Sequence, residues 1–220
     1  MKVSKKFLIL FVGAVFGLIA VSFGIFKLVE YQAYVKDSPY DVLLSDIQSN
    51  SVTISWKSAS ELPTYVKIGE NEKLFGQDQI SKIHKVKLEG LKESSTYTFV
   101  ISDGNRDWVL PSESNSEDIQ EFLIKEFVFT TKESKEEITI PEVREIQTLP
   151  NEEVYLVAYD PVEEKYSDIK TYTANRFGGI AVDIYSFEGV DIDEGTEIKN
   201  IGYTDRRNIL SQSYISSIFA

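Results

Sequence analysis

The residue types that carry most enzymatic chemistry are sparse in this 220-residue chain. The chain has one histidine, His84, and no cysteine, which excludes disulfides, thiolate metal sites and a cysteine nucleophile. A single histidine cannot build a two-metal centre, so we interpret His84 as a surface or packing residue. The sequence also lacks a Gly-x-Ser-x-Gly elbow, a phosphate-binding loop and a zinc motif. We therefore expect a protein that is not an enzyme and holds no metal or cofactor.

One acidic stretch has part of the pattern of a calcium loop. Asp191 and Asp193 alternate, and Gly195 follows. The order of Glu194 and Gly195 does not fit an EF-hand, and no glutamate stands at the twelfth position. We interpret this stretch as a solvated turn. Paired acids elsewhere leave open a glycosidase, whose two carboxylates face each other across a cleft.

The candidate binding residues are Arg106, Asp107 and Trp108, in a long connection at residues 103–125. Loops at the ends of β-sandwiches are common places for binding residues. The Trp108 ring could stack on a sugar or a protein partner, or it could cover the edge of a sandwich. The residues alone leave these alternatives open.

The elements that must position these residues are mainly β-strands. In residues 51–57, Val52, Ile54 and Trp56 alternate with polar residues, which is typical of a strand with one buried face. Further short strands are predicted near residues 42–44, 64–69, 85–89, 97–102 and 127–131, with turns between them. This pattern predicts an antiparallel sandwich over residues 40–131, with Trp56 anchoring its core.

Residues 40–131 resemble a fibronectin type III domain. The strand that ends in Trp56 and the run from Leu91 to Tyr97 carry this resemblance, although Glu93 stands where that family usually has proline. The resemblance implies a tyrosine corner, in which the Tyr97 hydroxyl bonds back to the chain. The segments TYVKIG, HKVKLEGL, STYTFVISDG and FVFTT also resemble the variant at the N-terminus of purple acid phosphatases. The phosphatase catalytic domain, with its His, Asp and Asn ligands, is absent from this chain.

A second β-domain is predicted after the charged linker at residues 132–138. Strands are expected at residues 143–147, 154–159, 169–174, 180–184 and 198–203, within a domain at residues 139–220 whose last part, 205–220, we leave unassigned. The run VYLVAYD, Ser167 and the stretch from Thr173 to Asp183 more weakly resemble transthyretin-like regulatory modules of carboxypeptidases. That resemblance implies a non-catalytic module. The linker suggests that the two domains move independently.

The N-terminus predicts a membrane anchor. Residues 7–26 carry no charge and are long enough to cross a bilayer, within a helix at 7–29. The basic tail at 1–6 should stay in the cytoplasm, and a stem at 30–39 should lead to domains outside the cell. A signal peptide cleaved near residues 20–22 is the alternative. Gly13 and Gly17 have the small-xxx-small spacing of helix pairs, which is common by chance.

Charge narrows the choice of partner. The net charge is −12, and the part beyond residue 29 holds 19 bases and 35 acids, which gives −16. This charge disfavours nucleic acid and anionic lipid as partners of the exposed part. The lack of cysteine and of Asn-x-Ser/Thr acceptors fits a prokaryotic envelope. We expect a single-pass surface protein that binds or holds an envelope protein or polysaccharide. The alternatives are a carbohydrate-binding module that uses Trp108 and an accessory subunit of an envelope complex.

Overall fold

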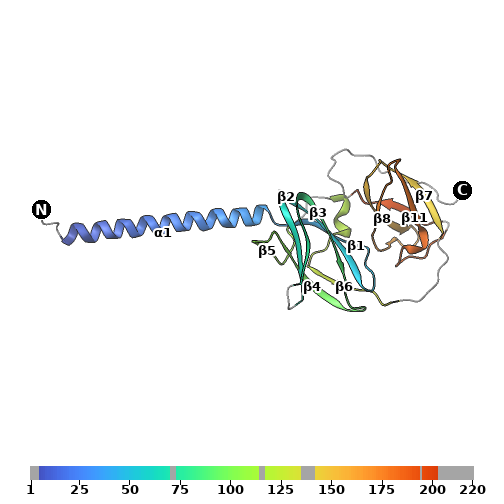
Figure 1. The fold of residues 1–220 in the computed structure, drawn as a ribbon, viewed down its shortest axis with the longest axis horizontal. Helices are drawn as coiled ribbons and strands as arrows, with labels where there is room; N and C mark the ends of the chain where they lie inside the picture. The colour runs from blue at the N-terminus through green and yellow to red at the C-terminus, as the bar shows by residue number, and fades with distance from the viewer. Residues whose placement is uncertain (1–4, 70–72, 114–116, 135–141, 194, 203–220) are drawn as a thin grey trace. The chain divides into compact units, whose positions relative to one another are not determined.

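The computed structural model describes residues 5–69, 73–113, 117–134, 142–193 and 195–202. Within them, one long helix precedes a series of antiparallel strands (Figure 1). The predicted fold class is confirmed, since the protein is mainly β with one N-terminal apolar helix and several antiparallel sheets. Residues 1–4 of the predicted basic tail, residues 135–138 of the predicted linker and residues 203–220 lie outside the described part.

Helix α1 (Lys5–Lys36) has 32 residues and is about 48 Å long at about 1.5 Å per residue. It is long and apolar enough to be a membrane span or a signal sequence. The helix continues through most of the segment that we expected to be a stem. There the Lys27 ammonium lies 2.7 Å from the Glu30 carboxylate, one turn away, which supports the helical geometry.

The first β-part consists of six strands: β1 (Tyr40–Ser45), β2 (Ser51–Ile68), β3 (Lys73–Glu89), β4 (Thr96–Ser102), β5 (Asp107–Trp108) and β6 (Val128–Thr130). Two strands that we expected at 51–57 and 64–69 are one 18-residue strand, β2. Its pairing register shifts between Lys57 and Thr64. Before that shift β2 lies between β1 and β3, and after it β2 lies between β4 and β3. These pairings join β1 to β6 into one six-stranded sheet, in which the irregularity lets β2 change its neighbour on one side.

Aromatic side chains fill the core of the first β-part. Trp56 stacks on His84 from β3, with ring centroids 5.1 Å apart. Phe99 from β4 stacks on Phe127, with centroids 4.8 Å apart. All four side chains are buried: Trp56, His84 and Phe99 point inward from β2, β3 and β4, and Phe127 directly precedes β6. The predicted alternation around Trp56 therefore describes the inner face of β2.

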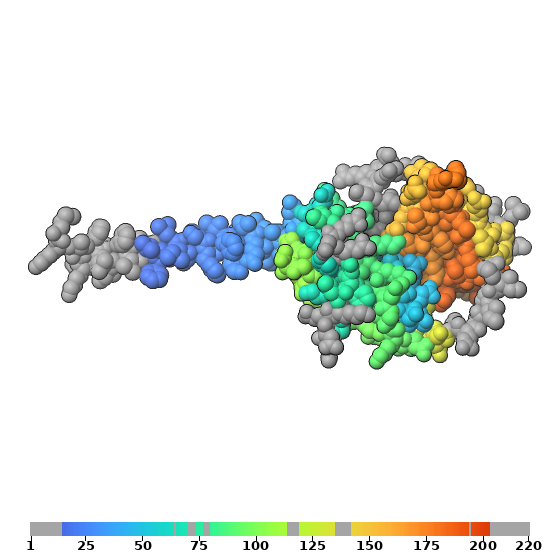
Figure 2. All heavy atoms as spheres, in the orientation of Figure 1, coloured from blue at the N-terminus to red at the C-terminus, as the bar shows by residue number. Residues whose placement is uncertain are grey.

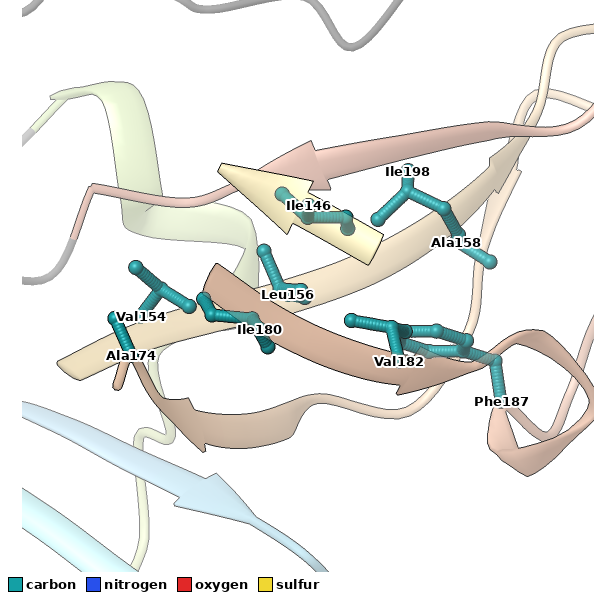
Figure 3. Close-up of a cluster of buried hydrophobic side chains, with 9 residues drawn as sticks. All are labelled: Ile146, Val154, Leu156, Ala158, Ala174, Ile180, Val182, Phe187 and Ile198. Atoms are coloured by element: carbon teal, nitrogen blue, oxygen red, sulfur yellow. The ribbon is translucent and has the colours of Figure 1, made fainter. Parts of the chain in front are cut away.

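The second β-part has two sheets. One joins β10 (Lys170–Thr173), β8 (Glu153–Asp160) and β12 (Glu197–Asn200), with β9 (Lys165–Tyr166) also paired to β8. The other pairs β7 (Val143–Gln147) with β11 (Gly179–Asp183). Side chains of both sheets meet in one buried cluster, shown in Figure 3: Ile146, Val154, Leu156, Ala158, Ala174, Ile180, Val182, Phe187 and Ile198.

Candidate functional site

The candidate site lies where the two β-parts meet, at a contact that we call the seam. Its apolar centre joins Leu43 of β1 to Tyr155 and Val157 of β8. The short helix η1 (Glu117–Phe122), from the long connection before β6, adds Ile119. The remaining members of this cluster are Ile169, Ile201, Phe122, Leu123 and Tyr166. Burying this many apolar side chains between the two parts favours their association.

Strand β8 is buried on both faces. Val154, Leu156 and Ala158 point into the core of the second β-part, whereas Tyr155 and Val157 point into the seam. All five have at most 2% of their surface exposed. This double burial explains the uninterrupted apolar run in VYLVA, because a strand covered on both sides has no face that must be polar.

The polar face of β2 supplies the hydrogen bonds of the seam. The Ser55 hydroxyl lies 2.9 Å from the Tyr155 hydroxyl, which donates to Glu153 at 2.7 Å. The other Glu153 oxygen accepts from the Lys85 ammonium at 2.5 Å. Burial raises the pKa of Tyr155, so its hydroxyl stays a donor at every physiological pH. The chain of bonds satisfies the polar groups that the seam removes from water.

Bonds from the turn after β1 extend the seam. The Asp46 amide donates to the Ile169 carbonyl at 2.9 Å, and the Asp46 carboxylate accepts from the Thr171 amide at 3.0 Å. Lys132 also reaches across, with its ammonium 2.7 Å from the Asp168 carboxylate. In the space-filling view the two β-parts abut (Figure 2). These contacts favour one unit over the independent motion that the linker suggested, because relative motion would expose the buried cluster and break these bonds.

A polar cleft of about 300 Å³ opens beside the buried part of the seam. Its lining comes from both β-parts and consists of Asp46, Gln48, Ser51, Thr53, Lys85, Lys87 and Thr171. The strand register orders these groups across the sheet, since Thr53 of β2 pairs with Ser45 of β1 on one side and with Lys87 of β3 on the other. The cleft therefore has a lysine side and an Asp46 side, with hydroxyl groups between them.

Two hydroxyls of β2 line the cleft without a partner in the described part of the chain, and their oxygen atoms reach the solvent in it. Ser51 and Thr53 have 8% and 3% of their surface exposed. Among the described residues, neither hydroxyl has a hydrogen-bond partner, although both line the cleft. Thr171, by contrast, bonds to the Ser45 hydroxyl at 2.7 Å. Each of these hydroxyls can donate one hydrogen bond and accept others, so the cleft offers free donors and acceptors to a polar group that enters it.

The charges around the cleft nearly balance. Lys85 pairs with Glu153, and Lys87 pairs with Glu89 at 2.6 Å. The pKa of Lys87 is raised, mainly by the hydrogen bond and charge of Glu89, with a further contribution from Asp46. Three carboxylates thus accompany two ammonium groups, which leaves a net charge of about −1 around the cleft.

The predicted binding residues lie apart from this cleft, and one of them is buried. Trp108 in β5 pairs with Ile101 of β4 and has 2% of its surface exposed. The Arg106 guanidinium lies 5.2 Å from the centroid of its ring. The suggestion that Trp108 offers a platform for sugar stacking is therefore wrong, because no face of the indole reaches solvent. Trp108 instead covers the sandwich edge, which was the structural alternative.

The other two predicted binding residues form ion pairs within the first β-part. Arg106 lies 2.7 Å from the Asp103 carboxylate, in the turn between β4 and β5. Asp107 pairs with Lys67 of β2 at 2.8 Å. Both pairs hold β5 against its neighbours, and they are partly exposed to solvent. Nothing in these contacts points to a ligand.

The residues predicted to be structural are placed in the first β-part. Trp56 is buried, as is Leu91 at 9% exposure. The Lys92 amide donates to the Tyr97 hydroxyl at 2.8 Å, which is the bond that a tyrosine corner contains. The Tyr97 ring also stacks on Phe129 at 5.4 Å. These contacts fix the crossing between β3 and β4.

His84 is a buried packing residue beside a serine. Its Nε2 atom lies 2.7 Å from the Ser58 hydroxyl, which donates to the Ser60 carbonyl at 2.7 Å. Because that proton points to a carbonyl, the ring must donate to Ser58, and the serine is not prepared to act as a nucleophile. Burial lowers the pKa of His84 from 6.5 to about 4, so the ring is neutral near pH 7.

The acidic stretch near Asp193 forms a turn. One Asp193 oxygen accepts from the Gly195 amide at 2.8 Å and from the Thr196 hydroxyl at 3.1 Å. Within the described residues, no group of three or more His, Asp or Glu side chains lies close enough to hold a metal ion. The geometry agrees with the interpretation as a turn.

Sequence reasoning missed the seam and the cleft. The run VYLVA carried a usable signal, because five consecutive buried residues require a cover on each face of a strand. The small polar residues Ser51, Thr53 and Ser55 carried no signal of the cleft, since a strand face exposed to solvent has the same composition.

Comparisons with known proteins add little. No protein-family model matches the chain, and no curated protein matches it. A solved structure titled "Central Fibronectin-III array of RIM-binding protein" is similar at 14% sequence identity and a TM-score of 0.29. The match covers 80% of this chain and 60% of that one, so the chain spans less than two thirds of the array. A likeness this weak carries no argument about function.

The seam predicts that residues 40–131 and 142–202 tumble together. NMR relaxation of backbone amides in the full chain, in detergent micelles, should give one rotational correlation time for both β-parts. Leu43→Asp places a charge in the buried cluster and should produce two correlation times. Leu74→Asp, at a side chain that is 56% exposed, is the matched control and should leave the single time unchanged. Two times in the unaltered protein would contradict the seam.

Burial of His84 predicts a specific pH dependence of stability. Below pH 6.5 the unfolded chain gains a proton at His84, whereas the folded chain does not until about pH 4. Folding is therefore weakened as pH falls between these values, by about 3 kcal/mol in total. His84→Gln, which can still donate to Ser58, should remove this contribution. The free energy of unfolding of the unaltered protein and of the His84→Gln variant can be measured with denaturant at several pH values. The contribution of His84 is the change with pH in the difference between the two free energies, and equal pH profiles would refute it.

Proposed function

We propose that the chain is a non-catalytic, membrane-anchored protein of the prokaryotic cell envelope, whose β-unit holds or binds an envelope component outside the membrane. The seam is the observation that best supports this proposal. It joins the two β-parts into one unit through buried apolar contacts and the bonds of Ser55 and Tyr155. A preorganised unit loses little conformational entropy when it binds, which suits a scaffold or a receptor.

The helix supplies the second element of the proposal. As an anchor, α1 would hold the β-unit at the membrane and raise its effective concentration toward a neighbouring partner. Lys2, Lys5 and Lys6 favour a cytoplasmic N-terminus. The alternative carbohydrate-binding function loses its main support, because Trp108 is buried.

The orientation can be tested with introduced cysteines, because the chain has none of its own. Val162→Cys changes a side chain that is 87% exposed, and it should react with a membrane-impermeant maleimide in intact cells. Ser4→Cys, in the predicted cytoplasmic tail, should react only after lysis. Both variants should remain in the membrane pellet after an alkaline wash. Release from the membrane would indicate a cleaved signal peptide, and the opposite labelling pattern would refute the orientation.

The binding function predicts retention of the full chain on envelope material. Detergent-solubilised protein should bind untreated envelope from the cells that produce it. It should not bind polysaccharide from that envelope after the protein has been stripped away. The Leu43→Asp variant, whose β-parts should separate, is expected to bind less. Retention on the stripped polysaccharide would favour the carbohydrate alternative, and retention on neither material would contradict the proposed function.

A further inference from the structure

We propose that the polar cleft at the seam binds a small zwitterionic ligand, one that carries a carboxylate and an ammonium group. The carboxylate would lie toward Lys87 and the hydroxyls of Ser51 and Thr53, and the ammonium group toward Asp46. This inference names a ligand class for the proposed binding function and rests on that function for its biological role.

The donors on one side of the cleft select the carboxylate. The Ser51 and Thr53 hydroxyls open into the cleft, lack partners among the described residues and lie one strand away from Lys87. Two hydroxyls and an ammonium group are a donor set that a carboxylate can satisfy, since each of its oxygens accepts more than one hydrogen bond. Lys87 can take part because its present partner, Glu89, is a surface residue on the same strand.

Asp46 selects the ammonium group. Its carboxylate is fixed in place, because it accepts from the Thr171 amide at 3.0 Å. It lies on the β1 side of the cleft, and the lysines lie on the β3 side. With β2 between them, the two strands are about 10 Å apart, so one small molecule can reach groups of both signs.

The net charge favours a ligand that is neutral overall. The cleft and its ion pairs sum to about −1, and the chain beyond residue 29 carries −16. A purely anionic ligand, such as an acidic sugar, would meet repulsion from this field, whereas a zwitterion would not. Within the described lining no aromatic side chain is present on which a sugar ring could stack.

The test is an NMR titration of the full chain in micelles with ω-amino acids of increasing length, from glycine to 6-aminohexanoate. This series varies the distance between the two charges and so measures the separation that the cleft accepts. At least one member should give saturable shifts of the Ser51, Thr53 and Lys87 amides. Its N-acetyl and amide derivatives, which each lack one charge, should bind at least tenfold more weakly.

Three variants assign the effect to the cleft. Lys87→Gln and Thr53→Val should each weaken binding at least tenfold, and Lys87 is exposed, so its replacement should not affect folding. Lys82→Gln, at an exposed lysine on the same strand outside the lining, should bind like the unaltered protein. The proposal is overturned if no member binds at 100 mM, if the two cleft variants bind normally, or if glucuronate binds as well as the zwitterions. None of these results would change the outcome of the cysteine-labelling test, so failure of the ligand proposal can be told apart from failure of the proposed membrane orientation.

Discussion

The burial of β8 on both faces is the constraint on which the rest of the β-unit depends. One face, with Leu156 at its centre, completes the core of the second β-part, and the other places Tyr155 and Val157 against the first. A strand with two apolar faces cannot be left half exposed without a large cost in hydrophobic free energy. The second β-part therefore needs the first as a cover, which makes the seam part of the fold.

The seam combines apolar and polar contacts in a way that fixes its geometry. The apolar cluster around Leu43 supplies most of the favourable free energy, but apolar contacts alone tolerate sliding. The bonds that link Ser55, Tyr155, Glu153 and Lys85 are directional, and misalignment would leave buried polar groups unsatisfied. Together they define one arrangement of the two β-parts within the unit formed by residues 39–220.

The cleft is a consequence of this arrangement. The polar face of β2 continues past Ser55, which Tyr155 covers, to Thr53 and Ser51, which line the cleft. The two β-parts thus leave part of the polar face of β2 open to small molecules. A site of this kind uses residues of both parts, and its shape depends on the seam remaining closed. Ligand binding and seam stability are thereby coupled.

Local patterns in the sequence determined much of the fold. Residues 7–26 specified an apolar helix by composition alone, and the period-two alternation at Val52, Ile54 and Trp56 specified the inner face of β2. The strand at residues 143–147 was predicted with its observed bounds, because turn residues and polar runs flank it. Alternation could not show that β2 continues unbroken to Ile68, since the irregular register near Lys57 depends on two different neighbouring strands.

Only the tertiary structure decided the site. Trp108 has the composition of a binding residue, yet it lies under Arg106 and is buried, because exposure depends on how β5 folds back onto β4. Ser51 and Thr53 look like a solvated strand face, yet they line a cleft formed with Thr171, more than a hundred residues away. Sequence patterns report the faces of single elements, which follow from local backbone geometry. Which face covers which is decided by contacts between distant segments, and that pairing created both the seam and the cleft.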